Sequence, residues 1–302
     1  MPQHKTIERK ALIIGIVVNV IQVAAGMAVF FMTGLKAMFL DFSFTAISVL
    51  SGLVAVYLSK RTVRTTERFP NGMFALEPIY AICKAIFTMS LLLYSLIDVC
   101  RVAYDYFVLG EGERITTGPV VVYEVLAVLA CFGLYLYYRR ENQSIRNAST
   151  MLTAECKSSL VDGAMSFGVG AVAIFLMVLP VDGPLSFLHY TGDFFITVAL
   201  VVLTIKEPFA VLKEAFVELV GGVHDDDETN AFVESEAQRH LPANTEYEQT
   251  LIFKTGMNYT VDVYLAGTGE TIDVADLVDR KRSLEQALKR RLHIVDVDFV
   301  FD

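Results

Sequence analysis

The sequence predicts a membrane protein: a bundle of six transmembrane helices followed by a small cytosolic α+β domain. The first indication is composition, since 54% of the 302 residues are hydrophobic and the mean hydropathy is +0.49, whereas soluble domains contain roughly 45–50% apolar residues. The second is charge: residues 1–205 carry 15 basic and 14 acidic side chains, but residues 206–302 carry 10 and 20. We therefore expect two domains in different solvents, 1–206 and 207–302. The acidic third argues against a nucleic-acid partner.

Six stretches reach the length of about 20 mostly apolar residues that a helix needs to cross a bilayer. The polar start MPQHKTIERK runs into the first of them without a cleavage site, so it reads as a retained cytosolic tail and not as a signal peptide. The predicted spans are 11–33, 36–58, 78–100, 119–138, 149–179 and 190–206.

Basic residues mark one set of loops and predict the orientation. They precede span one, separate spans two and three, and separate spans four and five, whereas the opposite loops are poor in net positive charge. Both termini are therefore expected on the cytoplasmic side of the cell membrane. The residues concerned are Lys5, Arg9, Lys10, Lys60, Arg61, Arg64, Arg68, Arg139, Arg140 and Arg146.

The C-terminal third has the pattern of a small two-layer domain. An amphipathic stretch at 207–222 leads into a helix at about 225–240. Alternating strands are expected at 250–255, 259–267 and 293–301, with a charged helix at 275–291 before the last strand. The predicted order is αββαβ.

Ionisable groups inside a membrane are costly, and each is a functional candidate. In span two, Asp41, Thr45 and Ser48 recur at i, i+4 and i+7, which places them on one helix face. In span five, Glu155 and Asp162 share a face with Ser158 or Ser159. Span three carries Lys84. Glu124 and Asp193 lie near helix ends and receive little weight, because an acid at a helix N-terminus is favoured by the dipole.

The chain resembles the cation diffusion facilitator family. The resemblance rests on six spans with cytosolic ends, polar faces on spans two and five, the terminal αββαβ domain, and RFPNGMFALEPIYAI (68–82), which is similar to the family's entry into span three. The segment YTVDVYLAGTGETIDVADLVDR also resembles the family's metallochaperone-like (ferredoxin-like) cytosolic domain. The resemblance implies a homodimer that exchanges a divalent cation against protons.

The family's membrane site has paired Asp or His ligands, four residues apart, on spans two and five. Aligned on the basic end of span two, these positions fall on Phe44, Ser48, Ser158 and Asp162, of which only Asp162 is a good ligand. An alternative register, shifted by one residue, places Asp41 and Thr45 at the two ligand positions of span two. The basic end of the span at Lys60 and Arg61 favours the first register, with Phe44 and Ser48 at these positions.

The candidate donors are all oxygens. No histidine falls in a predicted span, since the five are His4, His189, His224, His240 and His293. A zinc site of imidazole and carboxylate is therefore not expected, and Mn²⁺, Fe²⁺, Mg²⁺ or Co²⁺ is favoured. Asp41 and Asp162 are expected one turn apart in depth, roughly 4–5 Å, so that one cation or proton can bridge them. Lys84 is expected to pair with Glu155, making Glu155 a gate or structural group.

Three functions follow as hypotheses. The first is export of a divalent cation in exchange for protons, with the metal site formed by Asp41, Asp162, Thr45, Ser48, Ser158 and Glu155. The alternative is a non-transporting membrane scaffold or metal-sensing dimer, suggested by the replaced ligands. A membrane hydrolase is not supported, since GxGD-like and HExxH motifs are missing; no enzyme and no prosthetic group are expected. In the cytosolic domain, His224 with Asp225, Asp226 and Asp227, then His240, and His293 with Asp296 and Asp298 form only a weak metal-binding pattern.

Overall fold

A computed structural model of the chain describes residues 2–58, 62, 66–69, 72–112, 117–145, 150–180, 183, 185–256, 258–268, 271–292 and 294–301. Its contacts divide the chain into two compact units. The first, which we call the membrane unit, comprises Met1–Lys60 and Cys83–Val211. The second, the C-terminal unit, comprises Arg61–Ile82 and Leu212–Asp302. Residues 61–82, expected with the spans, thus group with the C-terminal residues.

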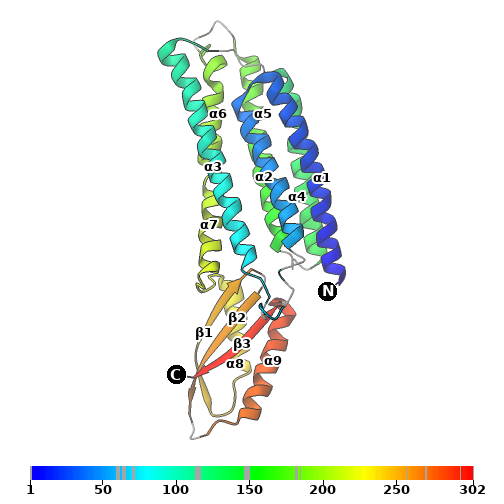
Figure 1. Cartoon of the computed structure of the whole chain (residues 1–302), viewed down its shortest axis with the longest axis vertical. Helices are drawn as coiled ribbons and strands as arrows, with labels where there is room; N and C mark the ends of the chain where they lie inside the picture. The colour runs from blue at the N-terminus through cyan, green and yellow to red at the C-terminus, as the bar shows by residue number, and fades with distance from the viewer. Residues whose placement is uncertain are drawn as a thin grey trace. The chain divides into compact units, whose positions relative to one another are not determined.

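Six helices in the described ranges are long and apolar enough to cross a membrane, as predicted. They are α1 (Pro2–Thr33), α2 (Lys36–Leu58), α3 (Leu76–Tyr104), α4 (Gly118–Ser144), α5 (Thr150–Val178) and α6 (Leu188–Thr204), and they run along one another in Figure 1. Large apolar side chains such as Phe31 and Val178, each 78% exposed, cover their outer surface. This outward apolar surface is what contact with lipid requires.

Several helices extend beyond the predicted spans, because flanking polar residues continue the helical backbone. The expected N-terminal tail belongs to α1, and α4 includes Arg139 and Arg140, both exposed. A π-helical turn, Asp105–Leu109, prolongs α3. Of the other residues used to predict orientation, Lys60, Arg61, Arg64 and Arg146 and the side chain of Lys5 lie outside the described part.

In the membrane unit, α2 packs against α1, α5 and α6, and α4 packs against both α1 and α5. Small residues permit the closest approaches. A Cβ placed on Gly26 of α1 would lie 2.7 Å from Tyr123 Oη and 2.8 Å from Phe42 Cβ. A stripe of glycine is a usual way to bring membrane helices together. These contacts hold α2, which carries three of the six candidate ligands, inside the bundle.

The motif before α3 forms a turn within the C-terminal unit. Gly72 has φ +84°, a backbone conformation that favours glycine, and the N–H of Met73 donates to the carbonyl of Thr62 at 3.0 Å. Gly256 approaches this segment closely, because a Cβ there would lie 2.8 Å from the Phe74 carbonyl. This packing explains why residues 61–82 group with the C-terminal unit.

The predicted αββαβ order is confirmed in the C-terminal unit, after the amphipathic helix α7 (Lys206–Leu219). Its elements are α8 (Asp227–Arg239), β1 (Thr245–Thr255), β2 (Asn258–Gly267), α9 (Val274–Leu292) and β3 (Val295–Phe301). β2 lies centrally, antiparallel to β1 and parallel to β3. β1 starts five residues before the predicted strand, because it pairs with the whole of β2 across a bulge at Glu248.

One face of the sheet and the two helices form the core of this domain. Val261, Val263 and Leu265 alternate along β2, and all three are buried against α8 and α9. Leu284 and Leu288, one turn apart on α9, complete the same core. The period of two in the strand and of nearly four in the helix is the pattern that predicted a two-layer domain.

Candidate functional site

The polar face predicted for α2 is buried. Asp41, Thr45 and Ser48 are only 3–4% exposed, whereas Phe44 is half-buried and packs against apolar side chains. Asp41 therefore lies on the inward face of the helix with the two hydroxyl residues. Phe44, which the preferred register places at a ligand position, belongs to the hydrophobic packing.

Two hydroxyl groups from neighbouring helices hold the carboxylate of Asp41. Ser166 Oγ of α5 donates to Asp41 Oδ1 at 3.0 Å, and Tyr123 Oη of α4 lies 3.3 Å from Oδ2. The Tyr123 hydroxyl also lies 3.2 Å from the Gln22 carbonyl of α1. A hydroxyl carries one proton, so it donates to only one of these acceptors at a time. Asp41 is thus the meeting point of α2, α4 and α5.

A second contact joins α2 and α5 deeper in the bundle, where Ser48 Oγ and Ser158 Oγ lie 3.3 Å apart. Together with the pair Asp41 and Ser166, it defines the antiparallel register of the two helices. Asp162 lies midway between Ser158 and Ser166 on α5 and therefore faces the level of Thr45. The sequence predicted this depth for Asp162, one turn inward of Asp41.

Asp162 is 5% exposed, and its Oδ1 atom has no hydrogen-bond partner. A buried polar atom without a partner costs about 1–3 kcal/mol. The Asp162 carboxylate is therefore available to a ligand at the α2–α5 seam, by which we mean Asp41, Thr45, Ser48, Ser158, Asp162 and Ser166.

Glu155, just under one turn beyond Ser158 on α5, is 8% exposed. The charge of Lys84 acts on both Glu155 and Asp162. The described side chains nevertheless include no direct ion pair between Lys84 and Glu155, so the expected pair is replaced by a longer-range attraction. The depth argument located both groups at one end of the bundle but could not give the distance between their side chains.

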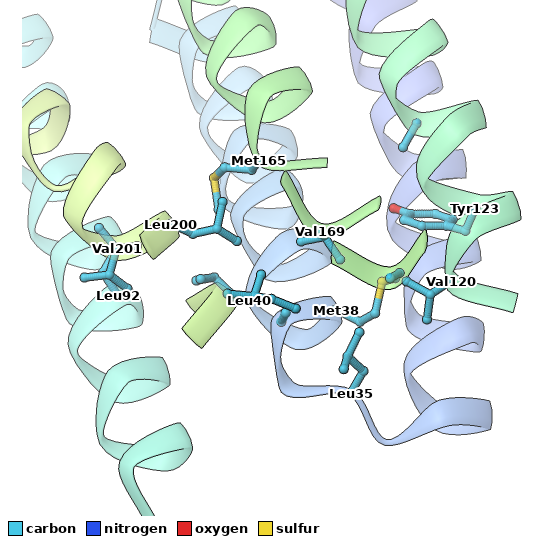
Figure 2. Close-up of a cluster of buried hydrophobic side chains, with 14 residues drawn as sticks. Leu35, Met38, Leu40, Leu92, Val120, Tyr123, Met165, Val169, Leu200 and Val201 are labelled. Atoms are coloured by element: carbon cyan, nitrogen blue, oxygen red, sulfur yellow. The ribbon is translucent and has the colours of Figure 1, made fainter. Parts of the chain in front are cut away.

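A cluster of apolar side chains lies at the end of the bundle where α2 and α4 begin, and it includes Leu40 and Tyr123. Figure 2 shows this cluster, with side chains from α2, α3, α4, α5 and α6 and the Tyr123 hydroxyl directed into the bundle. The labelled members are Leu35, Met38, Leu40, Leu92, Val120, Tyr123, Met165, Val169, Leu200 and Val201. Water is excluded by such packing, which strengthens electrostatic interactions at Asp41.

Three residues at Asp41 were missed or undervalued from the sequence. Ser166 continues the i, i+4 spacing of Ser158 and Asp162, so the helical period alone could have identified it. Tyr123 gave no signal beyond being aromatic. Glu124 was discounted for its closeness to a helix end, yet it is 1% exposed. Distance from a helix end is a poor measure of burial when neighbouring helices cover that end.

Asp193 is buried and acts on another helix than its own. Its two carboxylate oxygens accept hydrogen bonds from the backbone N–H groups of Lys36 and Ala37, at 2.5 and 2.7 Å. It therefore caps the start of α2. The sequence instead indicated a role for Asp193 at the dipole of its own helix, α6. Lys36 also forms an ion pair with Asp98 of α3 at 3.1 Å.

A histidine lies in the membrane helix α6, whereas the sequence predicted that none of the five falls in a span. His189 is the second residue of α6 and is 4% exposed, with Nε2 3.2 Å from the Leu179 carbonyl. This backbone contact holds it at the end of the bundle where α6 begins. It belongs to the packing there and contacts none of the seam residues through a described hydrogen bond.

The weak metal-binding pattern of the C-terminal unit has local structural explanations. Asp226 caps α8 by accepting from the N–H of Thr229 at 3.2 Å, and the Thr229 hydroxyl holds the pKa of this carboxyl below its usual value. Burial lowers the pKa of His224, whose ring lies edge-on to Tyr259. His240 contacts the Glu236 carbonyl, Asp296 and Asp298 are exposed, and His293 is outside the described residues.

Across the described part of the chain, no three His, Cys, Asp or Glu side chains lie close enough together to hold a metal ion. Any cation at the seam would therefore be bound by at most two carboxylates, with hydroxyl groups and water as further ligands. Hard cations such as Mg²⁺ are commonly held in this way.

Comparison with known proteins bears on this site. A family model described as the cation efflux transmembrane domain matches residues 12–220. The match runs from within α1, at residue 12, through the other five membrane helices to the end of α7. No curated protein matches the chain.

Proposed function

This chain belongs to the cation efflux family of membrane transporters, and on that premise we propose that it exports a divalent cation in exchange for protons through the α2–α5 seam. The observation that carries the proposal is Asp162, buried with an unpartnered oxygen beside the hydroxyl pair Ser48 and Ser158. Asp41 lies one turn away, within reach of the same path.

The donor set supports a hard cation. The seam presents two carboxylates and four hydroxyl groups, and neither histidine nor cysteine contributes to it. We therefore infer a preference for Mn²⁺, Fe²⁺, Mg²⁺ or Co²⁺ over Zn²⁺, which favours imidazole and thiolate ligands. Protons compete with cations for buried carboxylates, because burial disfavours the charged form of an acid. That competition is the physical basis of the proposed exchange.

Both termini are proposed to face the cytoplasm, and the C-terminal unit is proposed to mediate a homodimer. The exposed Arg9, Lys10, Arg139 and Arg140 lie at the ends of α1 and α4 expected on the cytoplasmic side. Mass measurement of the detergent-solubilised chain tests the dimer. Tags at either terminus, probed in sealed spheroplasts, test the orientation.

Proteoliposomes test transport. Purified protein is reconstituted with a pH-sensitive dye inside the vesicles, and Mn²⁺, Fe²⁺, Co²⁺, Mg²⁺ or Zn²⁺ is added outside. We expect Mn²⁺-dependent proton flux that is lost in Asp162→Asn and retained in Glu111→Gln, a control in an exposed loop. Absence of metal-dependent proton flux for all five cations would exclude the proposal and leave the scaffold or metal-sensing function as the alternative.

A further inference from the structure

Glu124 of α4 is an acid whose burial has no explanation in the packing. It is 1% exposed, and neither Oε1 nor Oε2 has a hydrogen-bond partner. Gly170 of α5 faces its Cβ, since a Cβ on Gly170 would lie 3.0 Å from it. A glycine at this point lets the acid enter the helix interface. Two unpartnered oxygens at such depth are expensive unless something binds them.

The surroundings of Glu124 are acidic and hydroxylic. Asp41 is the charged group that acts on it, and Ser166 is the hydroxyl residue that acts on it; the Ser166 hydroxyl already donates to Asp41 at 3.0 Å. The next residue back on α4 is Tyr123, whose hydroxyl lies 3.3 Å from the other oxygen of Asp41. Asp41 of α2 and Glu124 of α4 thus approach neighbouring turns of α5, Asp41 at Ser166 and Glu124 at Gly170.

No described basic side chain compensates these two acids. Lys84 acts on Glu155 and Asp162, deeper along α5, and not on Asp41 or Glu124. Lys36, near the start of α2, is paired with Asp98. Two carboxylates in a dry environment without a cationic partner form an attractive position for a bound cation, because little water competes for it.

We propose that Glu124, Asp41 and the Ser166 and Tyr123 hydroxyls form an oxygen-only cation site contributed by α2, α4 and α5, one turn from Asp162. This site rests on the proposed function and deepens it, because it supplies a position in the path that the α2–α5 seam alone does not contain. With two carboxylates and two hydroxyls, water completes the shell of a six-coordinate ion such as Mn²⁺. Asp162 is then the adjacent position toward the deeper end of the seam.

Direct Mn²⁺ binding tests this site independently of transport. The full-length protein is purified in detergent, and free Mn²⁺ is measured by electron paramagnetic resonance during titration. Glu124→Gln keeps the size of the side chain and removes its charge; we expect the affinity to fall about tenfold or more. Glu111→Gln makes the same chemical change at an exposed position and should match the wild type.

Elution volume and thermal unfolding show whether each variant is folded. If Glu124→Gln does not fold, Ser166→Ala, which removes one hydroxyl, should weaken Mn²⁺ binding without removing an acid. The site is overturned if folded Glu124→Gln binds Mn²⁺ as tightly as the wild type, or if Ser166→Ala does so where it replaces that variant. It is also overturned if the wild type does not bind Mn²⁺ at millimolar concentration. Vesicle flux separates the two proposals. If Mn²⁺ binding depends on Glu124 but no flux is seen, the proposed cation site is supported and transport is refuted. If flux is seen but Glu124→Gln binds Mn²⁺ like the wild type, transport is supported and the cation site is refuted.

Discussion

Asp193 of α6 accepts a hydrogen bond from the backbone N–H of Ala37, the second residue of α2, at 2.7 Å. A side chain from one helix thus satisfies the free N–H groups at the start of another. Because Asp41 follows Ala37 by one turn, this cap fixes the end of α2 that carries the candidate ligand.

Replacement of Asp193 by Ala should therefore destabilise the protein. Loss of an N-cap costs about 0.5–2 kcal/mol, and the freed N–H groups are buried. Thermal unfolding of the detergent-solubilised protein measures the effect. Asp193→Asn keeps one acceptor oxygen and should lose less, and Asp105→Ala, at an exposed position, should lose nothing. Equal stability of Asp193→Ala and wild type would show that the cap contributes no net stability.

Gly15 of α1 should not tolerate alanine. A Cβ there would lie 1.4 Å from the Tyr138 hydroxyl, and Tyr138 is 1% exposed, so its ring has little room to move. Overpacking of this kind costs about 1–3 kcal/mol. Gly133→Ala is the matched control, since no atom lies within 4 Å of the added Cβ. It should be neutral or slightly stabilising, and a similar loss in both variants would contradict the packing described for α1 and α4.

Glu218 should hold the β1–β2 hairpin against α7. Its carboxylate accepts from Lys254 Nζ at 3.0 Å and from the N–H of Gly256 at 3.1 Å. Burial would lower the pKa of Lys254, but the Glu218 charge raises it above its usual value. Glu218→Ala should cost about 1–3 kcal/mol and increase hydrogen exchange at Gly256.

The exposed pair of Glu285 and Lys289, 3.1 Å apart on α9, provides the comparison. Glu285→Ala should change stability by roughly 0.5 kcal/mol or less. If both variants lost the same stability, the hairpin contact would be worth no more than a surface ion pair.

Asp262 should make the C-terminal unit more stable at acidic than at neutral pH. It pairs with Asp298 across β2 and β3, and burial followed by the Asp298 charge raises its pKa. A carboxyl with a raised folded-state pKa destabilises the fold above that pKa, and the penalty disappears below the unfolded-state value. Asp262→Asn should therefore gain roughly 0.5 kcal/mol at pH 7 and little near pH 3.

Circular dichroism melts at the two pH values measure this difference. Asp296→Asn is the control, because Asp296 stands opposite Thr260 and not opposite another acid. A gain for Asp262→Asn that is the same at both pH values would show that charge repulsion is not its cause.

The sequence predicted the elements better than the contacts between them. Hydropathy over about 20 residues gave the six membrane helices, and strand alternation gave the αββαβ order. The helical period also placed Asp41, Thr45 and Ser48 on one face. Burial of Glu124 and the capping by Asp193 depend on which helices become neighbours. That information is not present in the local pattern of either segment.

The regular spacing along α2 and α5 has a mechanical consequence. Ser158, Asp162 and Ser166 recur at successive turns of α5, opposite oxygen-bearing residues of α2 at similar intervals. A slide of α5 by one turn, about 5.4 Å, would replace Ser166 by Asp162 opposite Asp41 and leave hydroxyl groups facing one another behind it. The two helices therefore have a second register in which Asp162 meets Asp41 and Ser158 meets Thr45. Ser166 then lies at the level of the buried Ala37, so such a ratchet would move one hydroxyl into apolar surroundings.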